Sequence, residues 1–233
     1  MSLVQAGPDI TRSALVVVDM QNDFLHPEGA FGVMAKDHPE RQIDMPFLAS
    51  TIPTTRRLIE AFRRAGRPVI YLAHVLKADY SDAAFPYFRG TTMKKTSFLV
   101  EGTWGAAIVD ELAPRPEEHL VIKKGFGGFA NTPLDTILRN YGVTTCVVCG
   151  VTTCVCVSTT VRGGLEYNYR MMIVGDAVAE VSRETHAAEL KTMQRVFGEV
   201  KTTAEIEALL APLRAEPRTA RDRKSTRLNS SHT

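Results

Sequence analysis

The four cysteines of this 233-residue chain lie within eleven consecutive positions, 146–156, and the last two fall where a strand gives way to a helix. Residues 144–149 are apolar and β-branched, as in a strand that is buried on both faces. Residues 157–165 then carry apolar side chains at helical spacing. A thiol in the first turn of a helix lies near unpaired N–H groups and the positive end of the helix dipole, which favour the thiolate. Cys154 and Cys156 are therefore candidates for nucleophilic catalysis.

Buried packing is the competing interpretation for each of these cysteines, because free cysteine is among the most buried residue types. Cys146 and Cys149 lie inside the strand, and we expect them to belong to the core. Their CxxC spacing does not open a helix, which argues against a redox pair. The clustering of all four argues against structural disulfides and favours a reducing compartment, the cytoplasm. A catalytic cysteine would also need partners.

The elements that would position such partners alternate along the chain. Apolar runs predict five strands and a possible short edge strand, at residues 13–18, 68–73, 119–122, 144–149, 169–174 and 199–201. Helical spacing predicts helices at residues 54–65, 104–112, 132–142, 157–165, 183–197 and 204–213, with Thr132 as the N-cap of the third and Gly142 at its end. This alternation indicates an α/β protein with three layers, α/β/α, around a mostly parallel sheet of five or six strands.

Three of the predicted strands end in residues that could act together. Asp19 follows the first strand, Lys123 follows the third, and Cys156 comes just beyond the fourth. Ligands of such sheets bind at the carboxyl ends of the strands, so we expect these side chains to converge there. A carboxylate can take the thiol proton, an ammonium can hold a thiolate or oxyanion, and the thiolate can attack a carbonyl. Taken singly, Asp19 or Lys123 would more often mark only the point where a strand meets solvent.

From about residue 14 to residue 197 the chain resembles the isochorismatase-like cysteine hydrolases. Four blocks carry the resemblance: Ala14-Leu-Val-Val-Val-Asp-Met-Gln-Asn-Asp-Phe24, Gly102-Thr-Trp-Gly-Ala-Ala-Ile-Val-Asp110, Lys123-Lys-Gly-Phe-Gly-Gly-Phe-Ala-Asn-Thr132 and Gly150-Val-Thr-Thr-Cys-Val-Cys-Val157. The resemblance implies that Asp19, Lys123 and Cys156 are the catalytic residues. It also implies a cis peptide between Val151 and Thr152, with the backbone N–H groups of Thr152 and Cys156 forming an oxyanion hole. Relatives commonly form dimers or tetramers, so it further implies a homo-oligomer.

The departures from the family pattern narrow the expected chemistry. Nicotinamidases of this superfamily bind a metal through an Asp-x-His…His arrangement, but residues 73–80 contain only His74, so we predict no metal and no cofactor. Isochorismatases proper hydrolyse a vinyl ether without this cysteine, so Cys156 favours amide cleavage. Gly127 stands where the family usually has a serine. The pattern of residues 126–132 looks closest to the ureidoacrylate, biuret and carbamoyl-amide hydrolase branch.

Four further residues are candidates for substrate binding: Asn22, Phe24, Phe126 and Phe129. Asn22 and its neighbour Gln21 follow Asp19 and could touch the substrate or orient Asp19, although packing of the loop would explain them equally well. The three phenylalanines could wall a pocket, whereas aromatic residues near strand ends more often belong to the core.

Composition sets the broader expectations. The length and the 44% hydrophobic content fit one domain, residues 1–213. Six of the 28 basic residues but only two of the 26 acidic ones lie from Arg214 onward, so the rest is near neutral and suggests no nucleic-acid face. Residues 214–233 read as a disordered basic tail, which also resembles a sequencing or assembly artefact. No apolar run is long enough to span a membrane, and the N-terminus shows no export signal.

Together these observations predict a cytoplasmic cysteine amidohydrolase that cleaves a C–N bond of a small amide, ureido or carbamoyl compound through a thioester, with water as the second substrate. Two alternatives stay open: a vinyl-ether hydrolase of the isochorismatase kind, and a non-catalytic relative that serves as a binding scaffold. The long segment 74–103 has no clear periodicity and is expected to be functional or mobile.

Overall fold

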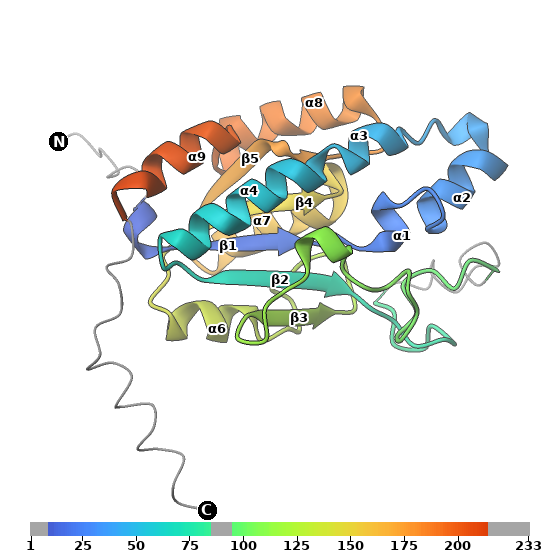
Figure 1. Ribbon diagram of the computed structural model, residues 1–233, viewed down its shortest axis with the longest axis horizontal. Helices are drawn as coiled ribbons and strands as arrows, with labels where there is room; N and C mark the ends of the chain where they lie inside the picture. Colours follow the sequence, from blue (N-terminus) through green and yellow to red (C-terminus); the bar gives the residue numbers. More distant parts are fainter. Residues whose placement is uncertain (1–8, 85–94, 214–233) are drawn as a thin grey trace, which may run out of the picture.

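The structure is a computed structural model that describes residues 9–84 and 95–213. Its middle layer is a sheet of six strands in the order β3-β2-β1-β4-β5-β6, with every neighbouring pair parallel (Figure 1). The strands are β1 (Ser13–Val18), β2 (Val69–His74), β3 (His119–Lys123), β4 (Thr145–Val151), β5 (Arg170–Ala179) and β6 (Glu199–Lys201). The predicted three-layer α/β fold is confirmed. The strand order reverses between β1 and β4, and ligands of such sheets bind at this switch point.

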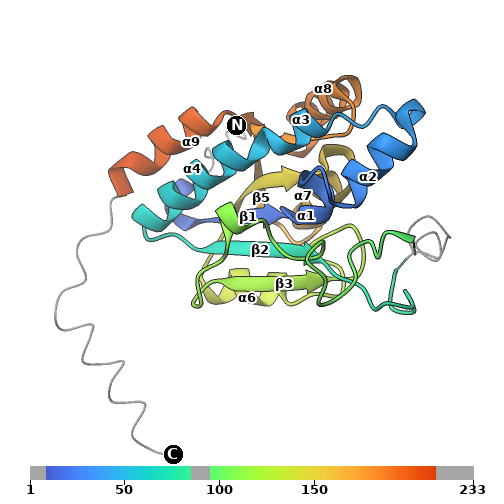
Figure 2. The same ribbon diagram turned by 45° about the vertical axis from the view of Figure 1, so that its right-hand side comes forward.

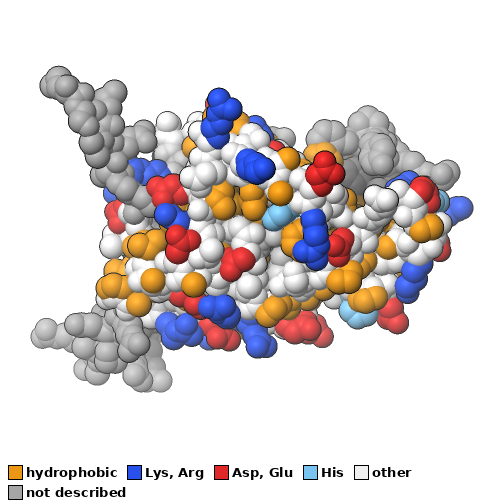
Figure 3. Space-filling model, turned by 90° about the horizontal axis from the view of Figure 1, so that it is seen from above, with side chains coloured by type: hydrophobic (Ala, Val, Ile, Leu, Met, Phe, Trp, Pro, Cys, Tyr) orange, Lys and Arg blue, Asp and Glu red, His pale blue; other side chains and the backbone are white. Residues whose placement is uncertain are grey.

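Both faces of the sheet are covered, which explains why β1 is a continuous apolar run. Leu15 and Val17 point into one cluster and Val16 and Val18 into the other, and all four are fully buried. On the first face lie α3 (Met45–Ala49), α4 (Thr51–Arg64) and α9 (Thr203–Leu210). The second face is covered by α6 (Leu134–Asn140), α7 (Ser158–Glu166) and α8 (Arg183–Thr192). On the face in Figure 3, basic and acidic side chains are interspersed.

The predicted strands all form, and three are longer than expected: β3 continues to Lys123, and two others extend further. β4 continues to Val151 and β5 to Ala179, with a register shift between Val148 and Gly150. The predicted helices near 54, 157, 183 and 204 also form. The second of these is preceded by a π-helical turn, Thr153–Val157, and the third is followed by another, Met193–Phe197.

The predicted helix at 104–112 is wrong, because only a short 3-10 turn, Asp110–Leu112, forms there. The loop after β1 takes the carbonyls that a helix would use for its own hydrogen bonds. The Asn22 side chain donates to Trp104 O and the Gln21 side chain donates to Ala106 O. Backbone N–H groups of residues 22 and 23 donate to the carbonyls of residues 107 and 105.

Helix boundaries also differ. The helix predicted from 132 begins at Leu134 with Pro133 in the N-cap position, although Thr132 Oγ1 still accepts a hydrogen bond from Leu134 N. Between β1 and α4 the chain forms short helices that periodicity did not predict, namely α1 (Asn22–Leu25), α2 (Ala30–Asp37) and α3. Short 3-10 turns complete the described chain at Ile10–Arg12, Pro39–Arg41 and Ala211–Leu213.

The carboxyl ends of the strands carry most of the irregular chain. In Figure 2, α1, α2 and the loops that follow β2 gather beyond the arrowheads of β1, β2 and β3. Within the segment 74–103, residues 85–94 lie outside the described part, while Leu76 and Val100 form a bridge that joins its two ends. The predicted tail, 214–233, also lies outside the described residues. None of the described helices could cross a membrane.

Candidate active site

Asp19, Lys123 and Cys156 converge at the carboxyl edge of the sheet. Asp19 follows β1, Lys123 ends β3, and Cys156 lies in the π-helical turn after β4. Lys123 Nζ is 2.8 Å from Asp19 Oδ2 and 3.5 Å from Cys156 Sγ, and it donates to Gly125 O at 3.0 Å. All three catalytic candidates are at most 4% exposed. The structure therefore places a carboxylate, an ammonium and a thiol in one buried cluster at the β1/β4 switch point.

The carboxylate of Asp19 is placed to exchange a proton with the thiol. It forms a buried ion pair with Lys123. Against the effect of burial, which raises the pKa of Asp19, hydrogen bonds from the Cys156 thiol, Lys123 and the backbone N–H of His74 lower it, so the thiol lies within reach of the carboxylate. Asp19 itself has a left-handed backbone, with φ of 49°. This turn carries the chain away from β1 into the loop held by Gln21 and Asn22.

Burial and the neighbouring charges shift the pKa values of all three catalytic candidates. Burial raises the pKa of the Cys156 thiol, and this outweighs the opposite effect of the Lys123 ammonium. Burial therefore favours the thiol form of Cys156 and opposes the thiolate stabilisation expected from the helix start, which stays a prediction. Burial also raises the pKa of Asp19 against the pull of Lys123, which makes the carboxylate a stronger base. Burial opposes the charge on Lys123, but Asp19 and Cys156 together raise its pKa, so the ammonium stays charged.

His74 is a fourth member of the cluster that the sequence interpretation did not assign to catalysis. It ends β2 and pairs with Lys123 in the sheet, and it is 1% exposed. Burial, reinforced by the Lys123 charge, lowers the pKa of His74 to about 3, so its imidazole is neutral. The strand-end rule that selected Asp19 and Lys123 applies equally to His74, and it could have been found in this way.

Asp19, His74 and Cys156 could together offer ligands to a metal. A carboxylate oxygen, a ring nitrogen and the sulfur all lie within 4.8 Å of one another, and they are the only such group of three among the described residues. The Lys123 ammonium, however, already lies beside two of them. A second cation would meet its repulsion. The expectation of no metal stays a prediction.

The turn that carries Cys156 is shaped by its backbone. The peptide between Val151 and Thr152 is cis, and Gly150 has φ of 113°. The carbonyl of Thr152 accepts hydrogen bonds from the N–H groups of Val155 and Val157. Cys146 and Cys149 are fully buried in β4, as predicted, while Cys154 is partly exposed and lies outside the cluster.

The candidate substrate-binding residues separate into two groups. Phe126 and Phe129 line a cavity of about 450 Å³ between the loop after β3 and α7, but Asp19, Lys123 and Cys156 are not among its lining residues. Phe126 lies 6.3 Å from His74 between ring centroids, whereas Phe129 is 3% exposed and belongs to the second hydrophobic cluster. Phe24 instead packs edge-on against Phe98 in the core, and Asn22 anchors Trp104 O. The core alternative therefore describes Phe24 and Phe129 better, and the loop-packing alternative describes Asn22.

Comparison with known proteins is consistent with this geometry. The Isochorismatase domain matches residues 13–205 of the chain. The chain is 31% identical to a ureidoacrylate amidohydrolase RutB of Azorhizobium caulinodans, in an alignment that covers 88% of this chain and 92% of the relative. The RutB protein of Methylobacterium radiotolerans is 32% identical, with 89% of this chain and 83% of the relative covered. The chain belongs to the isochorismatase family.

Solved structures agree with this assignment. A cysteine hydrolase from Pseudomonas syringae pv. phaseolicola 1448A superposes with a TM-score of 0.78 at 30% identity, covering 91% of this chain and 99% of that one. The N-carbamoylsarcosine amidase of Thermoplasma acidophilum superposes with a TM-score of 0.66 at 31% identity, covering 82% of this chain and 96% of the other. The predicted resemblance to this family is confirmed.

Proposed function

We propose that the protein is a cysteine-dependent amidohydrolase that cleaves a C–N bond, other than a peptide bond, in a small amide, ureido or carbamoyl compound. The observation that carries the proposal is the buried cluster in which Lys123 Nζ lies 2.8 Å from Asp19 Oδ2 and 3.5 Å from Cys156 Sγ. A base, a cation and a nucleophile in one desolvated site match the needs of acyl transfer. The named activities of the RutB proteins and of the carbamoylsarcosine amidase support the same substrate class.

The reaction begins with proton transfer from Cys156 to Asp19. The thiolate attacks the carbonyl carbon, and the backbone N–H groups of Thr152 and Cys156 stabilise the oxyanion. Lys123 keeps a positive charge beside the sulfur throughout. Asp19 returns its proton to the leaving nitrogen, so ammonia or an amine departs and a thioester remains. Asp19 then takes a proton from water, the hydroxide attacks the thioester, and the proton returns to the sulfur.

Replacing the nucleophile tests this mechanism. Cys156→Ala should abolish release of ammonia from simple amides and ureido compounds while leaving the circular dichroism spectrum unchanged. The matched control is Cys154→Ala, two residues away in the same turn, which should keep most of the activity. Mass spectrometry after adding substrate should find an acyl group on Cys156. A fully active Cys156→Ala variant would contradict the proposal. Loss of activity in Cys154→Ala alone would show that Cys154, and not Cys156, is the nucleophile.

The two alternatives predict different results in the same assays. A vinyl-ether hydrolase would be indifferent to alkylation of Cys156. A binding scaffold would release no ammonia from any of the simple amides or ureido compounds. The protein's partners are accordingly proposed to be a small amide and water.

A further inference from the structure

A buried carboxylate holds the turn that carries the nucleophile. Glu180 follows β5 and is 5% exposed. Its Oε2 accepts the N–H of Cys154 at 2.8 Å, and its Oε1 accepts the N–H of Val181 at 2.9 Å. Hydrogen bonds from N–H groups to a carboxylate are stronger than those between neutral groups. The N–H of Cys154 is thereby directed toward β5.

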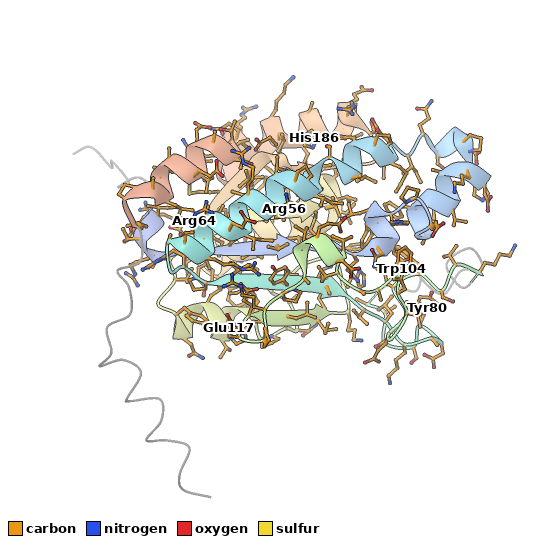
Figure 4. All side chains as sticks on the ribbon, in the orientation of Figure 1. Arg56, Arg64, Tyr80, Trp104, Glu117 and His186 are labelled. Atoms are coloured by element: carbon orange, nitrogen blue, oxygen red, sulfur yellow. The ribbon has the colours of Figure 1, made fainter. Side chains whose placement is uncertain are left out.

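Two further contacts bind the same region to the chain that follows Glu180. Thr153 Oγ1 lies 2.9 Å from His186 Nδ1 in the first half of α8. Ser158, at the start of α7, donates its hydroxyl to Glu189 at 2.6 Å. Figure 4 shows His186 on α8, on the upper side of the molecule, away from Trp104 and Tyr80. The segment 180–189 thus holds the nucleophile turn from one side.

The two cysteines of the turn face opposite charges. Cys156 Sγ lies 3.5 Å from the Lys123 ammonium. Cys154 instead lies beside the Glu180 carboxylate, and its thiol contacts Thr185 O at 3.5 Å. Burial, followed by the charge of Glu180, raises the pKa of Cys154 to about 12. A cysteine two residues from the nucleophile is therefore kept as a thiol.

We propose that Glu180 is a positioning residue of the active site, which fixes the turn that carries Cys156 and keeps Cys154 from acting in its place. The first role follows from the hydrogen bond to Cys154 N–H, since the backbone donors at residues 152 and 156 lie on either side of that peptide. The second follows from the Glu180 carboxylate, whose Oε2 lies 2.8 Å from the backbone nitrogen of Cys154 and so places a negative charge beside this cysteine. The positioning role, which is tested through kcat, rests on the proposed function, whereas the effect on the Cys154 thiol does not.

Glu180→Gln separates the proposed roles from simple packing. The amide side chain has nearly the same shape, but it places an NH2 group against one of the two N–H donors and removes the charge. Because small misplacements of a catalytic group are costly, we expect kcat to fall about 10- to 100-fold while KM changes by less than about twofold. The matched control is Glu184→Gln on the exposed side of α8, which should leave kcat unchanged.

Alkylation of Cys154 supplies a second readout that does not depend on enzymatic activity. In a Cys156→Ala background, iodoacetamide should label Cys154 up to about tenfold faster when Glu180 is replaced by Gln, since a neighbouring charge shifts a thiol pKa by about one unit. Glu180→Asp retains the charge and should keep the labelling slow, although the shorter side chain should still lower kcat. This variant also keeps the test open if Glu180→Gln fails to fold.

The outcomes are distinct. Unchanged kcat and unchanged Cys154 labelling in folded Glu180→Gln would overturn the proposal, and so would an equal loss of kcat in Glu184→Gln. If the wild-type protein hydrolyses no amide, the proposed function fails. Faster Cys154 labelling would still support the electrostatic role of Glu180.

Discussion

At the residue scale, the ion pair between Lys123 and Asp19 dominates the site, because both side chains are fully buried. A buried charge is costly unless a partner compensates it. The ammonium has Cys156 Sγ as a further neighbour, and burial favours the uncharged thiol there. In the proposed mechanism, the ammonium would stabilise the extra negative charge of the thiolate or the oxyanion.

Lys123→Met tests this balance through stability. The substitution leaves the Asp19 carboxylate buried without its cation, and we expect a loss of about 3–5 kcal/mol near neutral pH. The pKa of Asp19, already raised by burial, should rise further, so the folded variant binds a proton more tightly than the unfolded chain. Its stability deficit should therefore shrink as the pH falls through that raised pKa and grow as the pH rises. Urea unfolding at several pH values measures this.

The double variant Asp19→Asn, Lys123→Met is the control for that experiment. With both charges removed, the cost should be smaller than the sum of the single replacements, because the pair is coupled. An additive double variant, or a Lys123→Met deficit that does not vary with pH, would contradict the picture of a compensated buried pair.

The pH dependence of kcat/KM follows from the same residues. Asp19 must be unprotonated to accept the thiol proton, and burial raises its pKa. Activity should therefore fall on the acidic side at a pH above the value of about 4 for an ordinary aspartate. The pKa of Lys123 is also raised, so no alkaline loss should occur below about pH 10. Initial rates between pH 4 and pH 10 test both limbs, and an acid midpoint below 4 would exclude Asp19 as the base.

At the element scale, close contact between β1 and β4 sets where the nucleophile turn begins. Gly150 has φ of 113°, and a Cβ there would lie 2.0 Å from Val18 O. Gly150→Ala should therefore push β4 away from β1 and cost more than about 3 kcal/mol, because it adds a clash to backbone strain. Since Asp19 follows Val18 directly, activity should fall as well. Urea unfolding and kcat measure the two effects.

Gly142→Ala is the matched control for that strand contact. Its φ is 63°, but a Cβ there would meet nothing within 4 Å. Gly142→Ala should lower the free energy of unfolding by only about 1–2 kcal/mol, which is the cost of a left-handed backbone at a residue with a Cβ, and it should leave kcat unchanged. Equal effects of the two substitutions would show that backbone conformation alone, rather than the β1–β4 approach, explains Gly150.

At the scale of the whole molecule, the described residues, 9–84 and 95–213, form the sheet and the hydrophobic clusters around it. We therefore expect a chain that ends after Leu213 to keep its kcat and its free energy of unfolding to within about 0.5 kcal/mol. Size-exclusion chromatography with light scattering should be run on both forms. If the domain itself forms the predicted dimer or tetramer, the full-length and the truncated chain should have the same oligomeric state. A truncated chain that unfolds or loses activity would reject the single domain of residues 1–213. The cytoplasmic location stays a prediction.

The sequence by itself determined which residues end the strands and hence which ones could meet. Apolar runs that end in Asp19 and Lys123, and a cysteine just past a third run, suffice once the sheet is known to be parallel, because parallel strands share one carboxyl edge. The same local rules failed for 104–112, where side chains of Gln21 and Asn22, more than 80 positions away, take the carbonyls that a helix would need.

Only the tertiary structure decided the protonation of the site and its supporting groups. The helix start favours a thiolate at Cys156, whereas burial raises the pKa of its thiol, and desolvation depends on every element packed around the sulfur. Glu180 likewise gains its role from position, because its partner Cys154 comes from a distant turn of the chain. His74 ends a strand and could have been selected by the same rule as Lys123, but its burial and its lowered pKa come from the assembled fold. Strand ends can be read locally, whereas burial and charge balance are properties of the assembled fold.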